Sequence, residues 1–104
     1  MRKVTEQASK AFREGRSFRS GNTEVELTEY STRFKLHGHI IAFMDDDSGV
    51  LNTTLAGYPT VTTKERLNGL LTTLGIDGRY HTINHQPMLN GNIVGDSDWH
   101  KWRL

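Results

Sequence analysis

The sequence predicts an α+β domain: an antiparallel sheet of four or five strands packed with two helices, in the order helix, three-strand meander, helix, terminal strands. Apolar residues recur at helical spacing near both residue 8 and residue 70, and alternating segments lie between and after them. The 104 residues are 35% hydrophobic and 24% charged, without repeat, linker or low-complexity tract. We therefore expect residues 1–104 to form a single domain.

The first helix is expected from Val4 to Glu14, because Val4, Ala8, Ala11 and Phe12 form one apolar stripe and Gly15 follows. Residues 16–22 are small, polar or turn-forming and predict a connector.

The three-strand meander is expected over residues 23–29, 33–44 and 50–58. A hairpin around Tyr30 and Ser31 would set Leu27 opposite Phe34, Val25 opposite Leu36 and Glu26 opposite Lys35. In the second strand, alternation puts the buried side at Phe34, Leu36, Ile40, Ala42 and Met44. The turn 45–49 would then set Met44 facing Leu51 and Ile40 facing Leu55. Ile41 and Phe43 fall on the outer face, which is either covered by a helix of the same chain or used for binding.

The second helix is expected to begin at Thr62, with Thr62 and Glu65 forming a capping box, and to end at Gly75. Leu67, Leu70, Leu71 and Leu74 form its apolar stripe, and Gly69 predicts a close approach of another backbone. Arg66 and Asn68 are expected to be surface residues. A Tyr80–His85 run and the Asn90-Gly91 dipeptide predict a terminal pair of short strands.

The composition indicates the cellular compartment of the protein and excludes several kinds of active site. The sequence has no cysteine, no long apolar span and no signal-like amino-terminal segment, so we expect a cytoplasmic protein without disulfides and without a membrane partner. No P-loop, dinucleotide fingerprint or nucleophile elbow is present. We expect no enzymatic activity, no catalytic residue and no cofactor.

Five histidines raise the question of a metal. His37, His39, His81 and His85 could converge, with an oxygen ligand from residues 45–47, into the centre of a metal-dependent hydrolase. Their spacing matches no metal-binding motif, and a row of polar strand residues explains them more simply. We therefore assign no metal site, and the hydrolase is the second alternative.

Charge is uneven along the chain. Residues 1–19 contain six basic and two acidic residues, although the formal net charge of the chain is +1. Basic and aromatic residues mixed in this way are typical of single-stranded nucleic-acid binding. The first alternative function is therefore nucleic-acid binding through Lys10, Arg13, Arg16, Phe18 and Arg19.

The outer face of the sheet is the favoured interaction surface. Arginine and aromatic side chains among small polar residues are typical of protein interfaces and of homodimer contacts. The candidate interface residues are Arg33, Lys35, His37, His39, Ile41, Phe43 and Tyr58.

Two stretches resemble a group of small tailed-bacteriophage proteins of unassigned role. These are Leu36-His37-Gly38-His39-Ile40-Ile41-Ala42 and the Gly57-Tyr58 turn with Thr62-Thr63-Lys64-Glu65-Arg66-Leu67-Asn68-Gly69. The resemblance implies a protein made inside an infected bacterium and assigns no active residue. It favours a non-enzymatic accessory protein of host takeover or anti-defence that binds and blocks a host or defence macromolecule in the bacterial cytoplasm.

Overall fold

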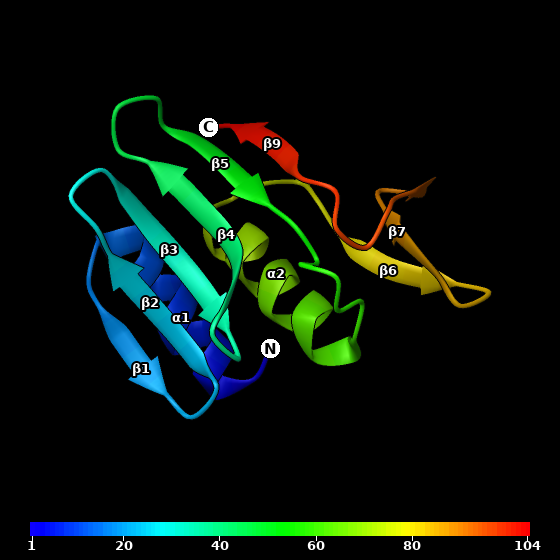
Figure 1. The fold of residues 1–104 in the computed structure, drawn as a ribbon, viewed down its shortest axis with the longest axis horizontal. Helices are drawn as coiled ribbons and strands as arrows, with labels where there is room; N and C mark the ends of the chain where they lie inside the picture. Colours follow the sequence, from blue (N-terminus) through cyan, green and yellow to red (C-terminus); the bar gives the residue numbers. More distant parts are fainter.

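The computed structural model describes residues 1–104 and has two helices and two antiparallel sheets (Figure 1). The α+β class is confirmed. The elements in chain order are α1 (Lys3–Glu14), β1 (Phe18–Ser20), β2 (Thr23–Leu27), β3 (Ser31–Leu36), β4 (His39–Asp45), β5 (Val50–Thr53), α2 (Val61–Thr73), β6 (Tyr80–Ile83), β7 (Gln86–Leu89), β8 (Asn92–Ile93) and β9 (His100–Arg103).

The strand count and order differ from the prediction. Six strands form one sheet in the order β1-β2-β3-β4-β5-β9, and β6-β7-β8 form a small second sheet. The connector after α1 contributes strand β1 because Phe18 lies opposite Val25 and packs against the core. The carboxyl-terminal strand β9 returns to pair with β5. Both helices lie behind the same face of the large sheet (Figure 1).

The expected strand 33–44 is two strands joined by a two-residue turn. His37 and Gly38 have φ values of 51° and 77°, the left-handed conformation that the tightest hairpins require. Apolar and polar residues alternate on both sides of this turn. The pattern therefore resembles one long strand when the turn is not recognised. His37 therefore lies in a turn, and His39 opens β4.

The register of β2 against β3 differs from the prediction by two residues. Val25 lies opposite Phe34, and Leu27 lies opposite Thr32. The turn closes one step earlier because the Thr28 N–H donates to the Ser31 carbonyl at 2.9 Å. A two-residue shift keeps every side chain on its predicted face.

A bulge in β4 reverses the predicted faces of two isoleucines. Phe34 pairs with Ala42 but Lys35 pairs with Ile40, so Ile41 is an extra residue on this strand. Ile41 turns into the core at 2% exposure, whereas Ile40 lies beside Lys35 on the outer face. The expectation that Ile40 is buried and Ile41 faces outward is wrong, because one inserted residue breaks the two-residue alternation.

Strand β5 ends at Thr53, five residues earlier than expected, and a loop leads to α2. Thr60, not Thr62, caps this helix: its Oγ1 accepts the Thr63 N–H at 3.1 Å. The predicted capping box is therefore wrong. The end at Gly75 is confirmed, since its φ of 72° is left-handed and its N–H donates to the Thr72 carbonyl.

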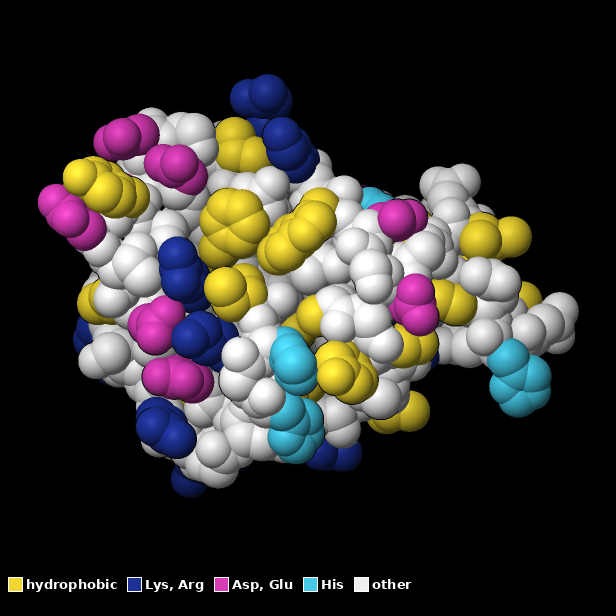
Figure 2. Space-filling view, in the orientation of Figure 1, with side chains coloured by type: hydrophobic (Ala, Val, Ile, Leu, Met, Phe, Trp, Pro, Cys, Tyr) yellow, Lys and Arg dark blue, Asp and Glu magenta, His cyan; other side chains and the backbone are white.

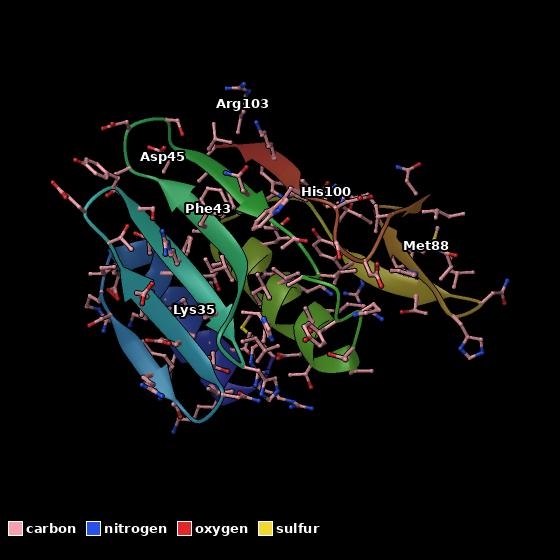
Figure 3. The ribbon with its side chains drawn as sticks, in the orientation of Figure 1. Lys35, Phe43, Asp45, Met88, His100 and Arg103 are labelled. Carbon is pink, nitrogen blue, oxygen red and sulfur yellow. The ribbon has the colours of Figure 1, made fainter.

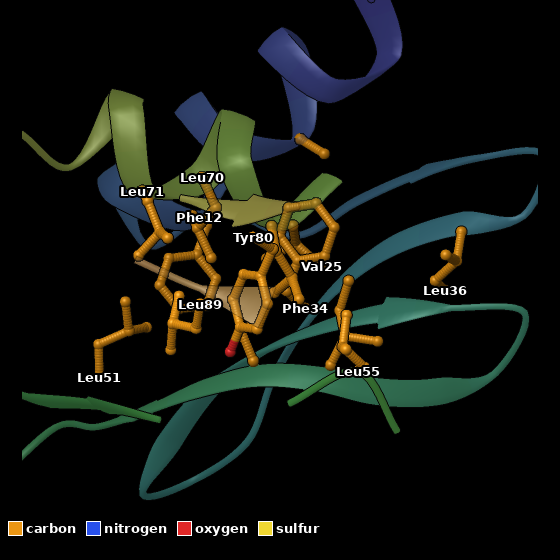
Figure 4. Packing of buried hydrophobic residues seen from close by; sticks show 14 of the residues in the cluster. Phe12, Val25, Phe34, Leu36, Leu51, Leu55, Leu70, Leu71, Tyr80 and Leu89 are labelled. Atoms are coloured by element: carbon orange, nitrogen blue, oxygen red, sulfur yellow. The ribbon is translucent and has the colours of Figure 1, made fainter. Parts of the chain in front are cut away.

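The hydrophobic core lies between the helices and the inner face of the large sheet (Figure 4). The Phe12 ring of α1 meets the Phe34 ring of β3 at a centroid distance of 6.3 Å. Leu67, Leu70 and Leu71 of α2 are fully buried, as the spacing predicts.

A buried polar cluster joins α1, α2 and β2. The Arg66 guanidinium donates to Thr23 Oγ1 at 3.1 Å, to Thr5 Oγ1 at 3.0 Å and to Glu65 Oε1 at 2.5 Å. Glu65 also accepts from the Thr5 hydroxyl and from the Arg2 N–H. Arg66 is only 3% exposed, so its expected surface position is wrong. A charge buried this deeply needs such partners.

Asn68 also has a structural role that the sequence analysis missed. Its amide accepts the Tyr80 N–H at 2.7 Å and donates to the Tyr80 carbonyl at 2.8 Å, which attaches β6 to α2. The Tyr80 hydroxyl then meets Thr53 Oγ1 at 2.8 Å, and the same oxygen accepts the Trp102 Nε1–H. Burial raises the pKa of Tyr80 to about 12, although the Thr53 hydrogen bond lowers it.

Gly69 marks a close contact between the two helices, as predicted. A Cβ atom placed there would overlap the Thr5 Cγ2 methyl of α1. We expect Gly69→Ala to lower the free energy of unfolding by about 1–3 kcal/mol in urea titrations, even though alanine favours helices. In a Thr5→Ser background, which removes the methyl and keeps the hydroxyl, the same change should cost less than half as much. A stabilising Gly69→Ala would contradict this packing.

Glu65 should make the fold sensitive to acid. Burial favours the neutral acid, but hydrogen bonds from Thr5, Arg2 and Arg66 outweigh it, and the pKa of Glu65 lies below its usual value of 4.5. Since the unfolded chain binds the proton more readily, the stabilisation is complete above about pH 4.5 and is lost as pH falls through the folded pKa. Urea titrations from pH 7 to pH 3 should show a shallower pH dependence for Glu65→Gln.

Glu14→Gln is the matched control for this acid sensitivity. The pKa of Glu14 is also lowered, chiefly by its hydrogen bond with Arg16, but that pair is exposed to solvent. Salt should therefore remove the effect of Glu14→Gln and leave that of Glu65→Gln. At roughly 0.5 M salt, exposed charges more than a few ångströms apart are largely screened. If the effects of both substitutions disappear equally at this concentration, the role of Glu65 in the buried cluster is contradicted.

Candidate functional site

The outer face of the six-stranded sheet is not covered by either helix. Both α1 and α2 lie on the opposite face (Figure 1), and Arg33, Lys35 and Phe43 of the central strands are partly exposed. Figure 2 shows this face, with hydrophobic side chains gathered near its centre and charged side chains around them. Phe43 lies on β4 at this face, where no helix covers it (Figure 3).

An aromatic pair forms the centre of this face. The Phe43 ring and the Trp99 ring meet edge to face, with centroids 5.2 Å apart and planes at 70°. Trp99 lies just before β9 and is 49% exposed. With Ile40 they border a hollow of about 310 Å³, which is also lined by Tyr30, Ser31, Arg33 and Asp45. We call Ile40, Phe43 and Trp99 the aromatic patch.

The charged residues beside the aromatic patch are paired with one another. Glu26 of β2 contacts Lys35 at 3.2 Å and Arg33 at 3.6 Å, and both cations lie on β3. All three side chains are partly exposed, so these ion pairs contribute little to stability. They neutralise part of the charge of the arginine and lysine side chains.

The structure divides the predicted interface residues into three groups. Arg33, Lys35 and Phe43 lie together on the outer face. Ile41 is in the core because of the bulge and is excluded from any surface. His37, His39 and Tyr58 lie at one end of the sheet, where the His39 and Tyr58 rings are 4.8 Å apart.

Trp99 and Ile40 are the patch residues that the sequence analysis missed. Trp99 is separated from Phe43 by more than fifty positions, and no local pattern shows that β9 returns to the sheet beside β5. Ile40 could have been found only by placing the bulge. The run Ile40-Ile41-Ala42, which lacks alternation, is the one signal that pointed there.

The residues predicted to bind nucleic acid are spread over α1, the loop after it and β1. Lys10 and Arg13 are exposed on α1, whereas Phe18 packs against the core. Arg16 pairs with Glu14 at 2.7 Å. Arg19 lies in β1 of the sheet, opposite Glu24 of β2. The aromatic group of this set is therefore not free to stack with bases.

The histidines do not supply a metal-ligand set. His37 lies in the β3–β4 turn and His39 opens β4, whereas His81 lies in β6 and His85 in the turn after it. No group of three or more histidine, aspartate or glutamate side chains is placed to hold a metal ion. No helix of the structure is long and apolar enough to cross a membrane.

Comparison with known proteins places the chain in a phage family. The family model described as Kyanoviridae Gp96 protein matches residues 1–103. The chain belongs to this family. Kyanoviridae are phages, so the expected phage origin is confirmed. No curated protein and no solved structure matches the chain.

Proposed function

We propose that this Gp96 family member is a non-enzymatic phage accessory protein that binds a host or defence protein and blocks its working surface. The observation that carries the proposal is the partly exposed aromatic patch of Ile40, Phe43 and Trp99 on the sheet face that no helix covers. Its site of action would be the cytoplasm of the infected bacterium.

The patch has the composition of a binding hot spot. Aromatic side chains packed around a hollow, with arginine and lysine at the margin, are typical of the few residues that dominate protein affinity. The hollow of about 310 Å³ could receive one apolar side chain of a partner. The charged margin, in which Glu26 pairs with Arg33 and Lys35, could exchange these pairs for partner charges.

Charge pairing favours a protein over a nucleic acid as the partner. Phosphate binding depends on unpaired cations that release counterions. On this face Arg33 and Lys35 share one carboxylate, and Asp45 borders the hollow. The free cations Lys10 and Arg13 lie on α1, behind the sheet, where no aromatic platform accompanies them.

The face, and not an edge of the sheet, is the proposed contact. Strand β1 has three residues, and β9 carries Lys101 and Arg103, so both edges have features that discourage pairing with another strand. A second copy of the chain could also cover the patch. That homodimer would be detected as a concentration-dependent mass in solution.

Affinity capture from expressing bacteria, followed by binding measurements with the purified partner, tests the proposal. We expect a protein retained after nuclease treatment, and a loss of affinity of roughly 10- to 100-fold for Phe43→Ser or Trp99→Ser, as for hot-spot residues. Both side chains are outside the core, so the fold should persist.

Lys10→Glu is the matched control, since it changes an exposed residue on the opposite side of the molecule. We expect it to leave the captured protein unchanged. Partners that disappear with nuclease, or binding that fails in Lys10→Glu and persists in Phe43→Ser, would support the nucleic-acid alternative and overturn the protein-binding proposal.

A further inference from the structure

A second hollow lies at the end of the sheet, between the β3–β4 turn and the start of α2. It has a volume of about 470 Å³, within the range of about 300–1,000 Å³ of small-molecule pockets. Most of its lining residues come from the two stretches that carry the family resemblance, among them Leu36, His37, His39, Ile41, Tyr58 and Thr62. We call it the turn pocket. It is separate from the aromatic patch and independent of the proposed function.

The floor of the turn pocket is aliphatic and one wall is aromatic. Leu36, Ile41 and Leu55 are 4%, 2% and 1% exposed, so each shows little more than one edge to a ligand. The His39 and Tyr58 rings lie against each other in a tilted stack, with centroids 4.8 Å apart and planes at 33°, and Tyr58 is 52% exposed. A flat ring could stack on this wall while its edge meets the aliphatic floor.

The rim is polar but carries no lysine, arginine or carboxylate. The Asn22 amide lies 3.3 Å from His37 Nε2, and when it donates there, the other ring nitrogen of a neutral His37 carries the proton and can donate to a ligand. Thr60 and Thr63 bond each other at 3.0 Å, whereas the Tyr58 and Thr62 hydroxyls and the His39 ring bond no protein group. These groups can both donate and accept.

Both walls of the pocket are held by constrained backbone. His37 and Gly38 form a left-handed pair at the β3–β4 turn, and Ala56 and Gly57 form another, with φ values of 56° and 80°, before Tyr58. Alanine seldom adopts this conformation, so the surrounding structure maintains it. The Tyr58 N–H also donates to the Leu55 carbonyl at 2.9 Å. The pocket is therefore preformed.

We propose that the turn pocket binds a neutral heteroaromatic ring with a hydrogen-bonding edge, the chemistry of a nucleobase. An aliphatic ligand would desolvate the polar rim without pairing it, which costs affinity. A strongly anionic group would find no lysine or arginine on the lining. A base satisfies both parts of the pocket, because its face can stack on the exposed side of the Tyr58 ring while its edge pairs with the Thr62 hydroxyl and His37.

The test is an NMR titration of the full chain with the four common ribonucleosides. We expect saturable shifts of the amide signals of His37, His39, Tyr58 and Thr62 with at least one nucleoside, and at least a tenfold weaker affinity for Tyr58→Ala. Thr62→Val, which removes only the hydroxyl at nearly constant shape, should weaken binding about threefold to tenfold, the loss expected when one hydrogen-bonding partner of about 1 kcal/mol is removed.

Ile93→Ala is the control, because Ile93 is an exposed apolar residue of the small sheet and lies outside both hollows. Its affinity should stay at the wild-type value. Absence of saturable shifts, equal binding by Tyr58→Ala, or equal binding of cyclohexanol in place of a base would overturn the proposal.

A second titration with trinucleotides distinguishes the source of the base. Tighter binding of a trinucleotide than of the matching nucleoside would assign the pocket to a base within a strand. Equal binding would assign it to a free nucleoside. Both results support base recognition, and neither alters the test of protein binding at the aromatic patch.

Discussion

The contact of Arg66 with Thr5, Thr23 and Glu65 is the interaction on which the arrangement of this protein depends. It joins α2 to α1 and to β2 at a point where Gly69 lets the helices come close enough for these short hydrogen bonds. If α1, α2 or β2 shifted, the buried guanidinium would lose a partner and its charge would be uncompensated. This cost favours one relative placement of the three elements.

This placement decides which face of the sheet is available. Because both helices are held together on one face, no helix covers the other, and β9 extends the sheet beside β5. The Thr53 hydroxyl, shared by Tyr80 and Trp102, attaches the small sheet and β9 to the same layer. Trp99, just before β9, is thereby brought beside Phe43.

The two candidate surfaces follow from local departures from regular strands. The bulge at Ile41 brings that side chain into the core, where it forms part of the floor of the turn pocket, and leaves Ile40 beside Phe43. The left-handed pairs at His37 and Ala56 shape the walls of the turn pocket. Regular alternation through these segments would have produced neither surface.

The sequence by itself determined the fold class, both helices, the stop at Gly75 and the close contact at Gly69, because helical spacing and glycine conformation are local properties. It also assigned Arg33, Lys35 and Phe43 to the outer face, since a two-residue register shift preserves faces. Only the tertiary structure decided that Arg66 is buried, that Ile41 turns inward and that Trp99 joins the patch. Those outcomes depend on which distant groups meet, and no local pattern contains that information.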